Sequence, residues 1–297
     1  MTAHPYVFFQ GDVPLAARIH RETGDWAERQ PAVIVTGSWL TVKEQMADHY
    51  AQALAARGYT AITFDFAGFG GSGGTPRQAE IPARKIADIV AVANQVASLS
   101  FVRPGAVGYL AVCASAQYTL AALAAGAPVA SFASVAGWFH DTGSVAPFYG
   151  GPDGVALRLD RARSALAEFQ RTGQALTVPA YENGNDRAGM FFELDYYADP
   201  GRGAVPEWVN AMAEFSWLYW LGFDGLAAAP RVSTPTLLVH GDGCVLPGNA
   251  KIVRDRLAGP ANMVWADGSQ TDFYDQPAQV SLALDAADEH FRRTLPS

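Results

Sequence analysis

The chain has 297 residues, of which 49% are apolar, and a formal net charge of −8. This length suits one α/β domain, or a core domain with an insertion, and the acidic balance without a basic run excludes nucleic acid and anionic membranes as expected partners. No apolar stretch approaches the ~20 residues of a transmembrane helix. Two cysteines and the lack of a signal-peptide pattern predict a cytoplasmic protein.

The first half of the chain alternates strands with helices. It opens with an antiparallel hairpin, predicted over residues 6–10 and 14–20. Apolar runs and helical stripes then predict strands at residues 32–36, 60–64, 107–112 and 129–135, with helices over 41–58, 82–99 and 114–125. Thr41 and Glu44 form the pattern of a capping box for the first of these helices. This alternation predicts a mostly parallel, doubly wound sheet with an antiparallel N-terminal edge.

The alternation stops after residue 137 and resumes at about residue 231. Residues 138–230 have no convincing core strand, but they carry two helical patterns, at residues 155–169 and 206–221, the second rich in aromatic residues. We expect this segment to be a mainly helical lid inserted into a core formed by residues 1–137 and 231–297. The core then continues with strands and helices predicted at residues 236–240, 247–257, 263–266 and 280–291.

The turn at Cys113, where a predicted strand becomes a helix, is the strongest functional signal. Its neighbours, including Ala114 and Ser115, are small, as a tight turn that forces backbones together requires. The pattern matches a nucleophile elbow with cysteine at its apex. One alternative puts Ser115 at the apex, which needs the larger Gln117 at a small position, and another makes Cys113 a buried structural thiol. The helix N-terminus after the turn predicts a lowered pKa for Cys113, and hence greater reactivity than Cys244.

Ligands of such sheets bind beyond the carboxyl ends of the strands. This rule places residues 37–39, 113–114 and 138–141 around one crevice. Trp39, Trp138 and Trp217 are predicted to contact the substrate there, because ligand pockets are mostly apolar.

The sequence has no pattern typical of nucleotide, metal or cofactor binding. The glycine-rich turn at residues 65–74 has no Lys-Ser/Thr pair after it, so we do not expect nucleotide binding. No His, Cys and carboxylate residues have metal-ligand spacing, and we predict neither a metal nor a cofactor.

The order of these features resembles the α/β-hydrolase superfamily over essentially the whole chain. Cysteine at the elbow, the Ala-Gly-Phe-Gly-Gly-Ser turn and the Asp-Phe-Tyr-Asp after the last strand resemble its dienelactone-hydrolase-like branch. This resemblance implies Cys113 as the nucleophile, with the backbone N–H groups of Ser38 and Ala114 as the oxyanion hole. It also implies a histidine where this chain has Gln270, and an aspartate where it has Gly243, next to Asp242.

Two of the three triad places are therefore altered. In some cysteine members, such as the tetramate-forming Dieckmann cyclases, the acid comes from the loop after the sixth strand, where Asp141 lies. His140 follows a strand at the correct end of the sheet and is the candidate base, with hydrogen bonding at the lid junction as its alternative role. His240 is expected to be structural, and the other histidines fall on the hairpin or on helices.

We expect an enzyme that uses Cys113 on a small ester, lactone or thioester. The alternative is a non-hydrolytic cyclase, lyase or isomerase, for example in natural-product biosynthesis, that works in the same pocket. Because the amide of Gln270 cannot accept a proton at neutral pH, release of an acyl-enzyme by water should be slow. The expected partner is a small-molecule substrate, with no nucleic acid and no membrane, and a homodimer is left open.

Overall fold

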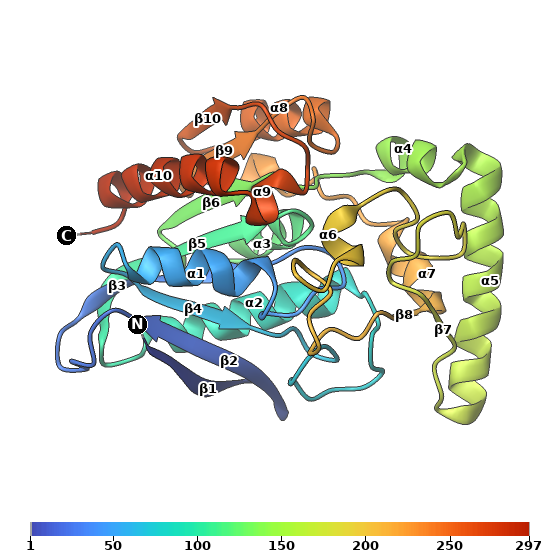
Figure 1. Cartoon of the computed structure of the whole chain (residues 1–297), viewed down its shortest axis with the longest axis horizontal. Helices are drawn as coiled ribbons and strands as arrows, with labels where there is room; N and C mark the ends of the chain where they lie inside the picture. The colour runs from blue at the N-terminus through green and yellow to red at the C-terminus, as the bar shows by residue number, and fades with distance from the viewer. Residues whose placement is uncertain (1, 297) are drawn as a thin grey trace.

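An eight-stranded, mostly parallel sheet forms the centre of the computed structural model, which describes residues 2–296 (Figure 1). The strand order is β1-β2-β4-β3-β5-β6-β9-β10. β2 (Val13–Arg21) pairs antiparallel with both β1 (Thr2–Gln10) and β4 (Thr60–Phe64), and the later neighbours all run parallel. The predicted sheet and its antiparallel N-terminal edge are therefore confirmed.

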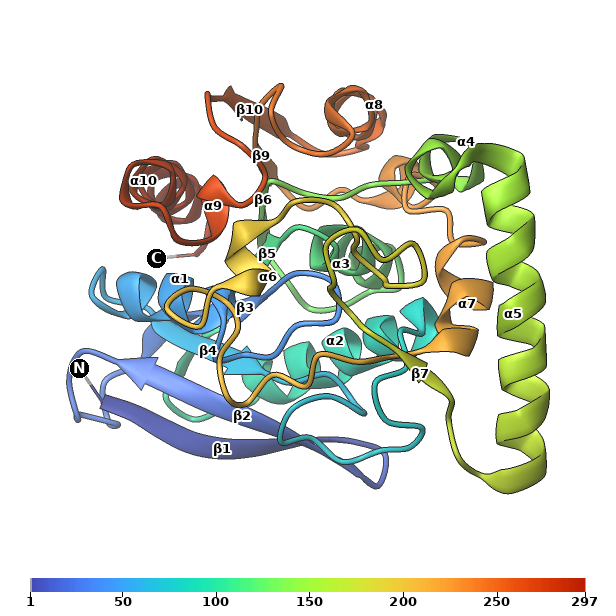
Figure 2. The same cartoon turned by 45° about the vertical axis from the view of Figure 1, so that its right-hand side comes forward.

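Helices cover both faces of this sheet, as parallel strands require. α1 (Met46–Ala55) and α10 (Pro277–Thr294) pack together on one face, while α2 (Pro82–Ala97) and α3 (Ser115–Ala124) pack on the other (Figure 2). The remaining core elements are β3 (Gln30–Thr36), β5 (Val102–Val112), β6 (Ser131–Val135), β9 (Thr236–His240), α8 (Pro247–Arg256), β10 (Ala261–Trp265) and α9 (Asp272–Asp275). Over residues 2–296, no helix has the length and apolar character needed to cross a bilayer.

Residues 138–230, here called the insertion, connect the neighbouring strands β6 and β9. The insertion stands beyond the carboxyl ends of the parallel strands (Figure 1). Its one long element is α5 (Gly151–Thr172), which ends at Gly173 in a left-handed conformation with φ of 74°. The others are short: α4 (Thr142–Val145), η1 (Ala146–Tyr149), β7 (Thr177–Val178), α6 (Asp195–Ala198), β8 (Met212–Ala213), η2 (Glu214–Ser216), α7 (Trp217–Trp220) and η3 (Ala229–Arg231).

Two predicted helices differ from the structure. The helix expected over residues 206–221 is only α7, because the chain before it is held to the core by side chains: Trp208 Nε1 donates to Leu40 O at 2.8 Å. The helix expected from Thr41 begins only at Met46. The Thr41 hydroxyl does not cap it, since it donates to Ser38 O at 2.7 Å within the loop between β3 and α1.

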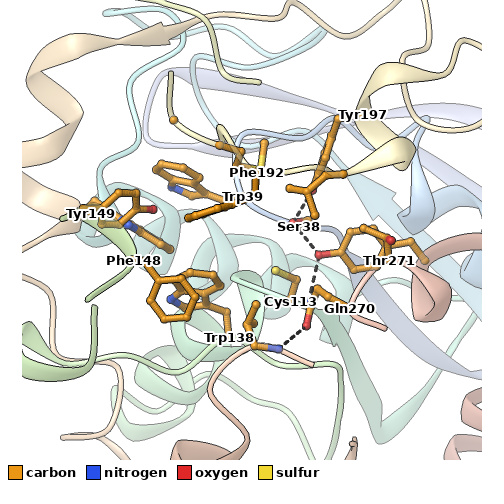
Figure 3. A pocket seen from close by; sticks show the side chains of 16 residues that line it. Ser38, Trp39, Cys113, Trp138, Phe148, Tyr149, Phe192, Tyr197, Gln270 and Thr271 are labelled. Atoms are coloured by element: carbon orange, nitrogen blue, oxygen red, sulfur yellow. Dashed lines mark hydrogen bonds between the residues drawn. The ribbon is translucent and has the colours of Figure 1, made fainter. Parts of the chain in front are cut away.

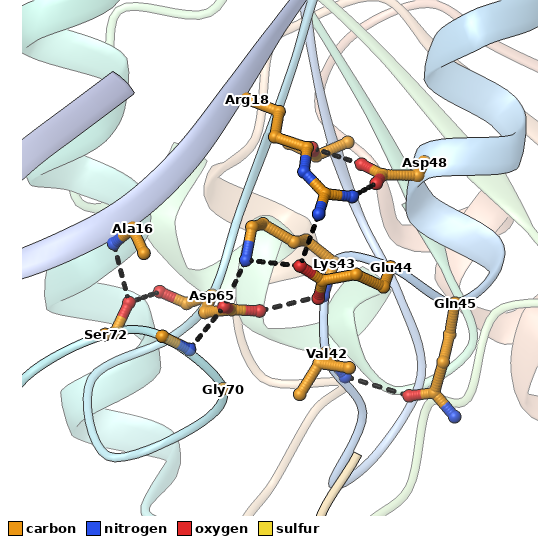
Figure 4. A network of polar contacts seen from close by, with 12 residues as sticks. Ala16, Arg18, Val42, Lys43, Glu44, Gln45, Asp48, Asp65, Gly70 and Ser72 are labelled. Atoms are coloured by element: carbon orange, nitrogen blue, oxygen red, sulfur yellow. Dashed lines mark hydrogen bonds and ion pairs between the residues drawn. The ribbon is translucent and has the colours of Figure 1, made fainter. Parts of the chain in front are cut away.

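The glycine-rich turn at residues 65–74 folds around its own carboxylate (Figure 4). Asp65 accepts hydrogen bonds from the N–H groups of Gly71 at 2.9 Å and Lys43 at 2.8 Å, and from Lys43 Nζ at 2.7 Å. Gly70 has φ of 45°, and a Cβ there would lie 2.2 Å from Asp65 Oδ2, so only glycine fits. Through Lys43, the turn fixes the loop between β3 and α1, which leads to the site described below.

Candidate active site

Cys113 occupies a strained turn between β5 and α3. Its φ is 58°, a left-handed value that costs a non-glycine residue about 1–3 kcal/mol. Its N–H donates to Val135 O at 3.1 Å, and its carbonyl accepts from Trp138 N at 2.9 Å, which holds the turn against the end of β6. Ser115 begins α3, and its hydroxyl donates to the backbone oxygens of Thr36 and Val112. Cys113, rather than Ser115, is therefore at the apex of the turn.

Four hydrogen-bond donors surround the sulfur of Cys113. They are the hydroxyls of Ser38 and Tyr274 and the backbone N–H groups of Trp39 and Ala114. Burial nevertheless raises the pKa of the Cys113 thiol, and the four donors offset this effect only in part. The predicted lowering of this pKa is wrong, because the side chain is only 4% exposed and its desolvation outweighs the helix N-terminus.

The other cysteine has a less favourable environment for a thiolate. Cys244 is also a free, buried thiol, and burial raises its pKa to about 12. The backbone hydrogen bond that lowers this pKa comes from Gly241 alone. Thiolate character is therefore better supported at Cys113.

The two backbone N–H groups at the sulfur are those of Trp39 and Ala114, whereas the predicted pair was Ser38 and Ala114. The N–H of Ser38 donates to Met46 Sδ at 3.4 Å, so it is not turned toward Cys113. The N–H of Trp39, the next residue, takes that place beside the N–H of Ala114. Ser38 contributes its side-chain hydroxyl to the sulfur instead.

Cys113 faces a small, mainly apolar cavity of about 80 Å³ (Figure 3). One side of it is formed by the core residues Ser38, Trp39, Val245, Gln270, Thr271 and Tyr274, together with Trp138 at the start of the insertion. The insertion forms the other side with Phe148, Tyr149, Gly189, Met190, Phe192, Leu194, Tyr197 and Trp220. Among residues 2–296, no histidine, aspartate or glutamate lines this cavity, and no group of three or more His, Cys, Asp and Glu side chains could hold a metal ion.

Gln270, where the resemblance implies a histidine, has both polar atoms of its amide hydrogen-bonded, and one of these bonds goes to Tyr274. Its Nε2 donates to Ala136 O at 2.8 Å and to Tyr274 Oη at 3.1 Å, and its Oε1 accepts from Val245 N at 3.0 Å. The Tyr274 hydroxyl also lies 3.3 Å from Ser38 Oγ. A chain of hydrogen bonds therefore runs from Gln270 to the groups around the sulfur.

The sequence did not single out Tyr274 or Tyr197 as site residues. Tyr197 Oη donates to Ser38 Oγ at 2.8 Å, although the two residues are 159 positions apart in the chain. Nothing local in the sequence could reveal that contact. For Tyr274 a signal was available, since it belongs to the Asp-Phe-Tyr-Asp segment that carries part of the family resemblance, which forms α9.

His140 and Asp141 lie outside the cavity wall. His140 Nδ1 accepts from Trp138 Nε1 at 2.7 Å, and Nε2 donates to Trp220 O at 2.8 Å. Burial lowers the pKa of His140 to about 4, so the ring is neutral near pH 7. Asp141 caps α4 and accepts from Ser144 N at 2.8 Å, which holds its pKa below its usual value. These contacts direct both residues away from the roles of base and acid expected for them.

Backbone fills the position where the resemblance implies an aspartate. A Cβ on Gly243 would lie 2.3 Å from Gly268 O, and Gly243 O accepts from Gln270 N at 3.1 Å. The loops after β9 and β10 therefore approach too closely for a side chain at this position. Asp242, the neighbouring carboxylate, accepts from Trp265 Nε1 at 3.2 Å in an exposed contact.

The structure agrees with the expectation for His240 but not with that for Trp217. His240 is buried, and its ring nitrogens lie 3.1 and 3.2 Å from the carbonyl oxygens of Gly241 and Gly137, as expected of a structural residue. Trp217 is not in the cavity wall. It packs behind the wall, with ring-centroid distances of 4.8 Å to Tyr149 and 5.7 Å to Trp39.

Comparisons with known proteins agree with this architecture, although no protein-family model matches the chain. The uncharacterised protein PA2218 of Pseudomonas aeruginosa is 26% identical, over 94% of this chain and 78% of its own length. Its crystal structure matches with a TM-score of 0.85 and 23% identity, covering 99% of this chain and 94% of that one.

Two named proteins are also similar. The acyltransferase drtE of Aspergillus calidoustus is 27% identical, over 82% of this chain and 80% of its own. The crystal structure of the α/β hydrolase GrgF from Penicillium sp. sh18 matches with a TM-score of 0.81 and 16% identity, over 99% of this chain and 98% of that one. This chain therefore has the α/β-hydrolase fold.

Proposed function

We propose that this protein is an acyl-transfer enzyme of the cysteine type, within the dienelactone-hydrolase-like branch of its fold, and that its acyl donor is a small thioester. One observation carries the proposal: Cys113 is surrounded by hydrogen-bond donors in a cavity whose wall, within residues 2–296, has no carboxylate or imidazole. Such a site favours a nucleophile whose reaction needs no separate base. Exchange between a thiol and a thioester meets this condition, because the leaving thiolate can take the proton that the attacking thiol loses.

The first step transfers the acyl group to the enzyme. The sulfur of Cys113 bonds to the thioester carbonyl carbon, the donor's C–S bond breaks, and the Cys113 proton leaves with the donor thiol. The N–H groups of Trp39 and Ala114 bind the carbonyl oxygen as it becomes negative. The hydroxyls of Tyr274 and Ser38 stabilise the sulfur while it carries charge.

The second step passes the acyl group to a hydroxyl or amine of an acceptor molecule. The acceptor's oxygen or nitrogen bonds to the acyl carbon, the bond to Cys113 breaks, and the acceptor's proton passes to the sulfur, which restores the thiol. Neither the acceptor nor water finds a general base here, since Gln270 cannot supply one, so transfer is favoured over hydrolysis only because the apolar cavity binds the acceptor and excludes water. The acyltransferase drtE, similar over most of this chain, supports transfer rather than hydrolysis.

The insertion would act as the lid of this site. Its aromatic side chains, among them Phe148 and Phe192, form the side of the cavity opposite the core. Closed in this way, the apolar wall keeps water from the acyl-enzyme, and the lid must open to admit the donor.

Mass spectrometry of the intact protein tests the proposal. Butanoyl thioester of N-acetylcysteamine should add one butanoyl group to Cys113, in a burst followed by slow steady-state release. Small alcohols or amines should accelerate that release and appear as butanoylated products. The matched control is Cys113→Ser, which should not be acylated because its hydroxyl is far less acidic and has no base beside it. Rapid hydrolysis without an adduct, or an adduct on Cys244, would contradict the proposal.

A second candidate is the intramolecular form of the same reaction, in which the acceptor group belongs to the acyl chain and the product is a ring. The small volume of the cavity, about 80 Å³, favours a reaction with one bound molecule. A hydroxyacyl thioester that yields a lactone faster than an external alcohol yields an ester would support this cyclase.

A further inference from the structure

A larger groove lies directly outside the catalytic cavity. Six residues line both spaces: Phe148, Phe192, Leu194, Val245, Gln270 and Thr271. The groove, here called the outer groove, has a volume of about 490 Å³, and its remaining lining residues are Glu193, Asp195, Arg202, Gly243, Ser269 and Asp272. Because the catalytic cavity has a volume of only about 80 Å³, an acyl group on Cys113 leaves little room in it for a second molecule. The continuous outer groove is therefore the space available to the molecule that receives the acyl group.

The outer groove carries more negative than positive charge. Its lining has the carboxylates of Glu193, Asp195 and Asp272, and one guanidinium, that of Arg202. The charge of Arg202 is already balanced by Asp275, to which its Nε and Nη2 atoms donate hydrogen bonds of 2.7 and 2.6 Å. The carboxylates of the groove are therefore left without an equal positive charge, and they favour a cation among the molecules that enter.

Two neighbouring side chains of the groove, Phe192 and Glu193, are available to bind such a cation. Glu193 is exposed and makes no hydrogen bond or ion pair within residues 2–296. Phe192 is 40% exposed, although phenylalanine is usually among the buried residues. Its ring centroid lies 6.3 Å from that of Phe148, with the two ring planes at 79°. Aromatic faces attract quaternary ammonium groups, so the groove offers a cation both aromatic surface and an unpaired carboxylate.

We propose that the outer groove binds the acyl acceptor and selects one that carries a positive charge, such as an alcohol with a quaternary ammonium group. The hydroxyl of this acceptor reaches the acyl carbon past Gln270 and Thr271, which line both spaces. There its oxygen bonds to the acyl carbon, the bond to Cys113 breaks, and its proton passes to the sulfur. Molecules with phosphate groups are disfavoured, because the carboxylates of the groove repel them. The inference rests on the proposed acyl transfer and specifies the class of its acceptor.

The experiment compares matched acceptors. Cys113 is acylated with the butanoyl thioester of N-acetylcysteamine, and loss of the butanoyl group is followed against the concentration of each acceptor. Choline and 3,3-dimethylbutan-1-ol have the same shape, but only choline is charged, whereas isethionate is a negatively charged alcohol. At low salt, choline should reach half of its maximal rate at a roughly 10-fold lower concentration than its neutral isostere, and isethionate should show no saturation. High salt should reduce the preference, because it screens exposed charges.

Variants assign the preference to the carboxylates of the groove. Glu193→Gln and Asp195→Asn should each reduce it by roughly two- to threefold, and the double variant should reduce it to about twofold or less. Glu207→Gln is the matched control: Glu207 is also an exposed carboxylate of the insertion, but it does not line the outer groove, so the preference should persist. Thermal melts check folding, and if one of the two test variants does not fold, the other decides.

The outcomes separate the two proposals. Equal half-saturating concentrations of choline and its neutral isostere, or a preference that survives both Glu193→Gln and Asp195→Asn, overturns selection by the outer groove while acyl transfer stands. Absence of any Cys113 adduct, or an adduct that no acceptor releases, overturns acyl transfer itself, and selection of the acceptor with it.

Discussion

At the scale of single residues, the Tyr274 hydroxyl controls how easily Cys113 ionises. Burial raises the pKa of Tyr274 well above its ordinary value, so the phenol stays protonated and acts as a donor, not as a base. It is one of two side-chain hydroxyls that hydrogen-bond the Cys113 sulfur and lower the pKa of the thiol. Gln270 holds Tyr274 in place, which makes Gln270 a positioning residue.

Tyr274→Phe should therefore raise the pKa of Cys113 further. A hydrogen bond to a charged group contributes about 1.5–3 kcal/mol, and one pKa unit corresponds to about 1.36 kcal/mol, so the shift should be about one to two units. The measurement is the rate of iodoacetamide alkylation against pH, whose midpoint should move upward. The control is Tyr197→Phe, which removes a donor to Ser38 but none at the sulfur. Equal shifts in the two variants would contradict the role given to Tyr274.

At the scale of elements, the loops after β9 and β10 are packed against each other through Gly243 and Gly268. Gly243→Ala should lower the free energy of unfolding by about 1–3 kcal/mol, because its Cβ would overlap a backbone oxygen that no side-chain rotation can move. Gly248→Ala is the control nearby: it lies in α8 with no atom within 4 Å of the added Cβ, so stability should stay the same or rise slightly. Chemical denaturation measures both, and equal effects would argue against the close packing.

The strands were predictable from the sequence, whereas part of the site was not. β4 and β9 match their predicted bounds because each is a short apolar run buried on both faces. The turn at Cys113 was predictable because steric crowding restricts the neighbours of a tight turn to small residues. The helices of the insertion were harder to predict, since long-range contacts such as that of Trp208 override helical periodicity.

The polar groups of the site were the least predictable part. His140 was a candidate base because it follows the correct strand, with hydrogen bonding at the lid junction as the alternative, and position along a strand does not determine which way a side chain points. Its ring turns to Trp138 and Trp220, away from Cys113. The linked hydroxyls of Ser38, Tyr197 and Tyr274 come from three distant segments, and only the folded chain brings them together.

At the scale of the whole molecule, His140 links the core to the insertion. Its ring bonds Trp138, just after β6, and Trp220 in α7, and its backbone N–H donates to Gln117 of α3 at 3.2 Å. The ring is held neutral, with a pKa of about 4 in place of the usual 6.5. Between these two values the unfolded chain binds a proton that the folded chain does not, so stability must fall as pH decreases from 6.5 to 4.

The titration of His140 alone should lower the free energy of unfolding by about 3 kcal/mol at pH 4 relative to pH 7. His140→Gln should remove that part of the pH dependence, because the amide offers an acceptor and a donor but does not titrate. The measurement is the free energy of unfolding from urea titrations between pH 4 and 7.5. The slope with pH is the decisive quantity, since the substitution can also change stability at neutral pH. An unchanged slope would show that another group is responsible for the acid sensitivity.

The contact between Gly243 and Gly268 also determines what it would take to build a histidine–aspartate pair at this site. A histidine at position 270 would have no carboxylate to orient it, and an aspartate at position 243 cannot enter until the two loops separate. Neither substitution is useful before the other, and one of them first damages the fold. A catalytic base at this site would therefore require both substitutions together with a wider separation of the two loops, and neither single substitution would supply it.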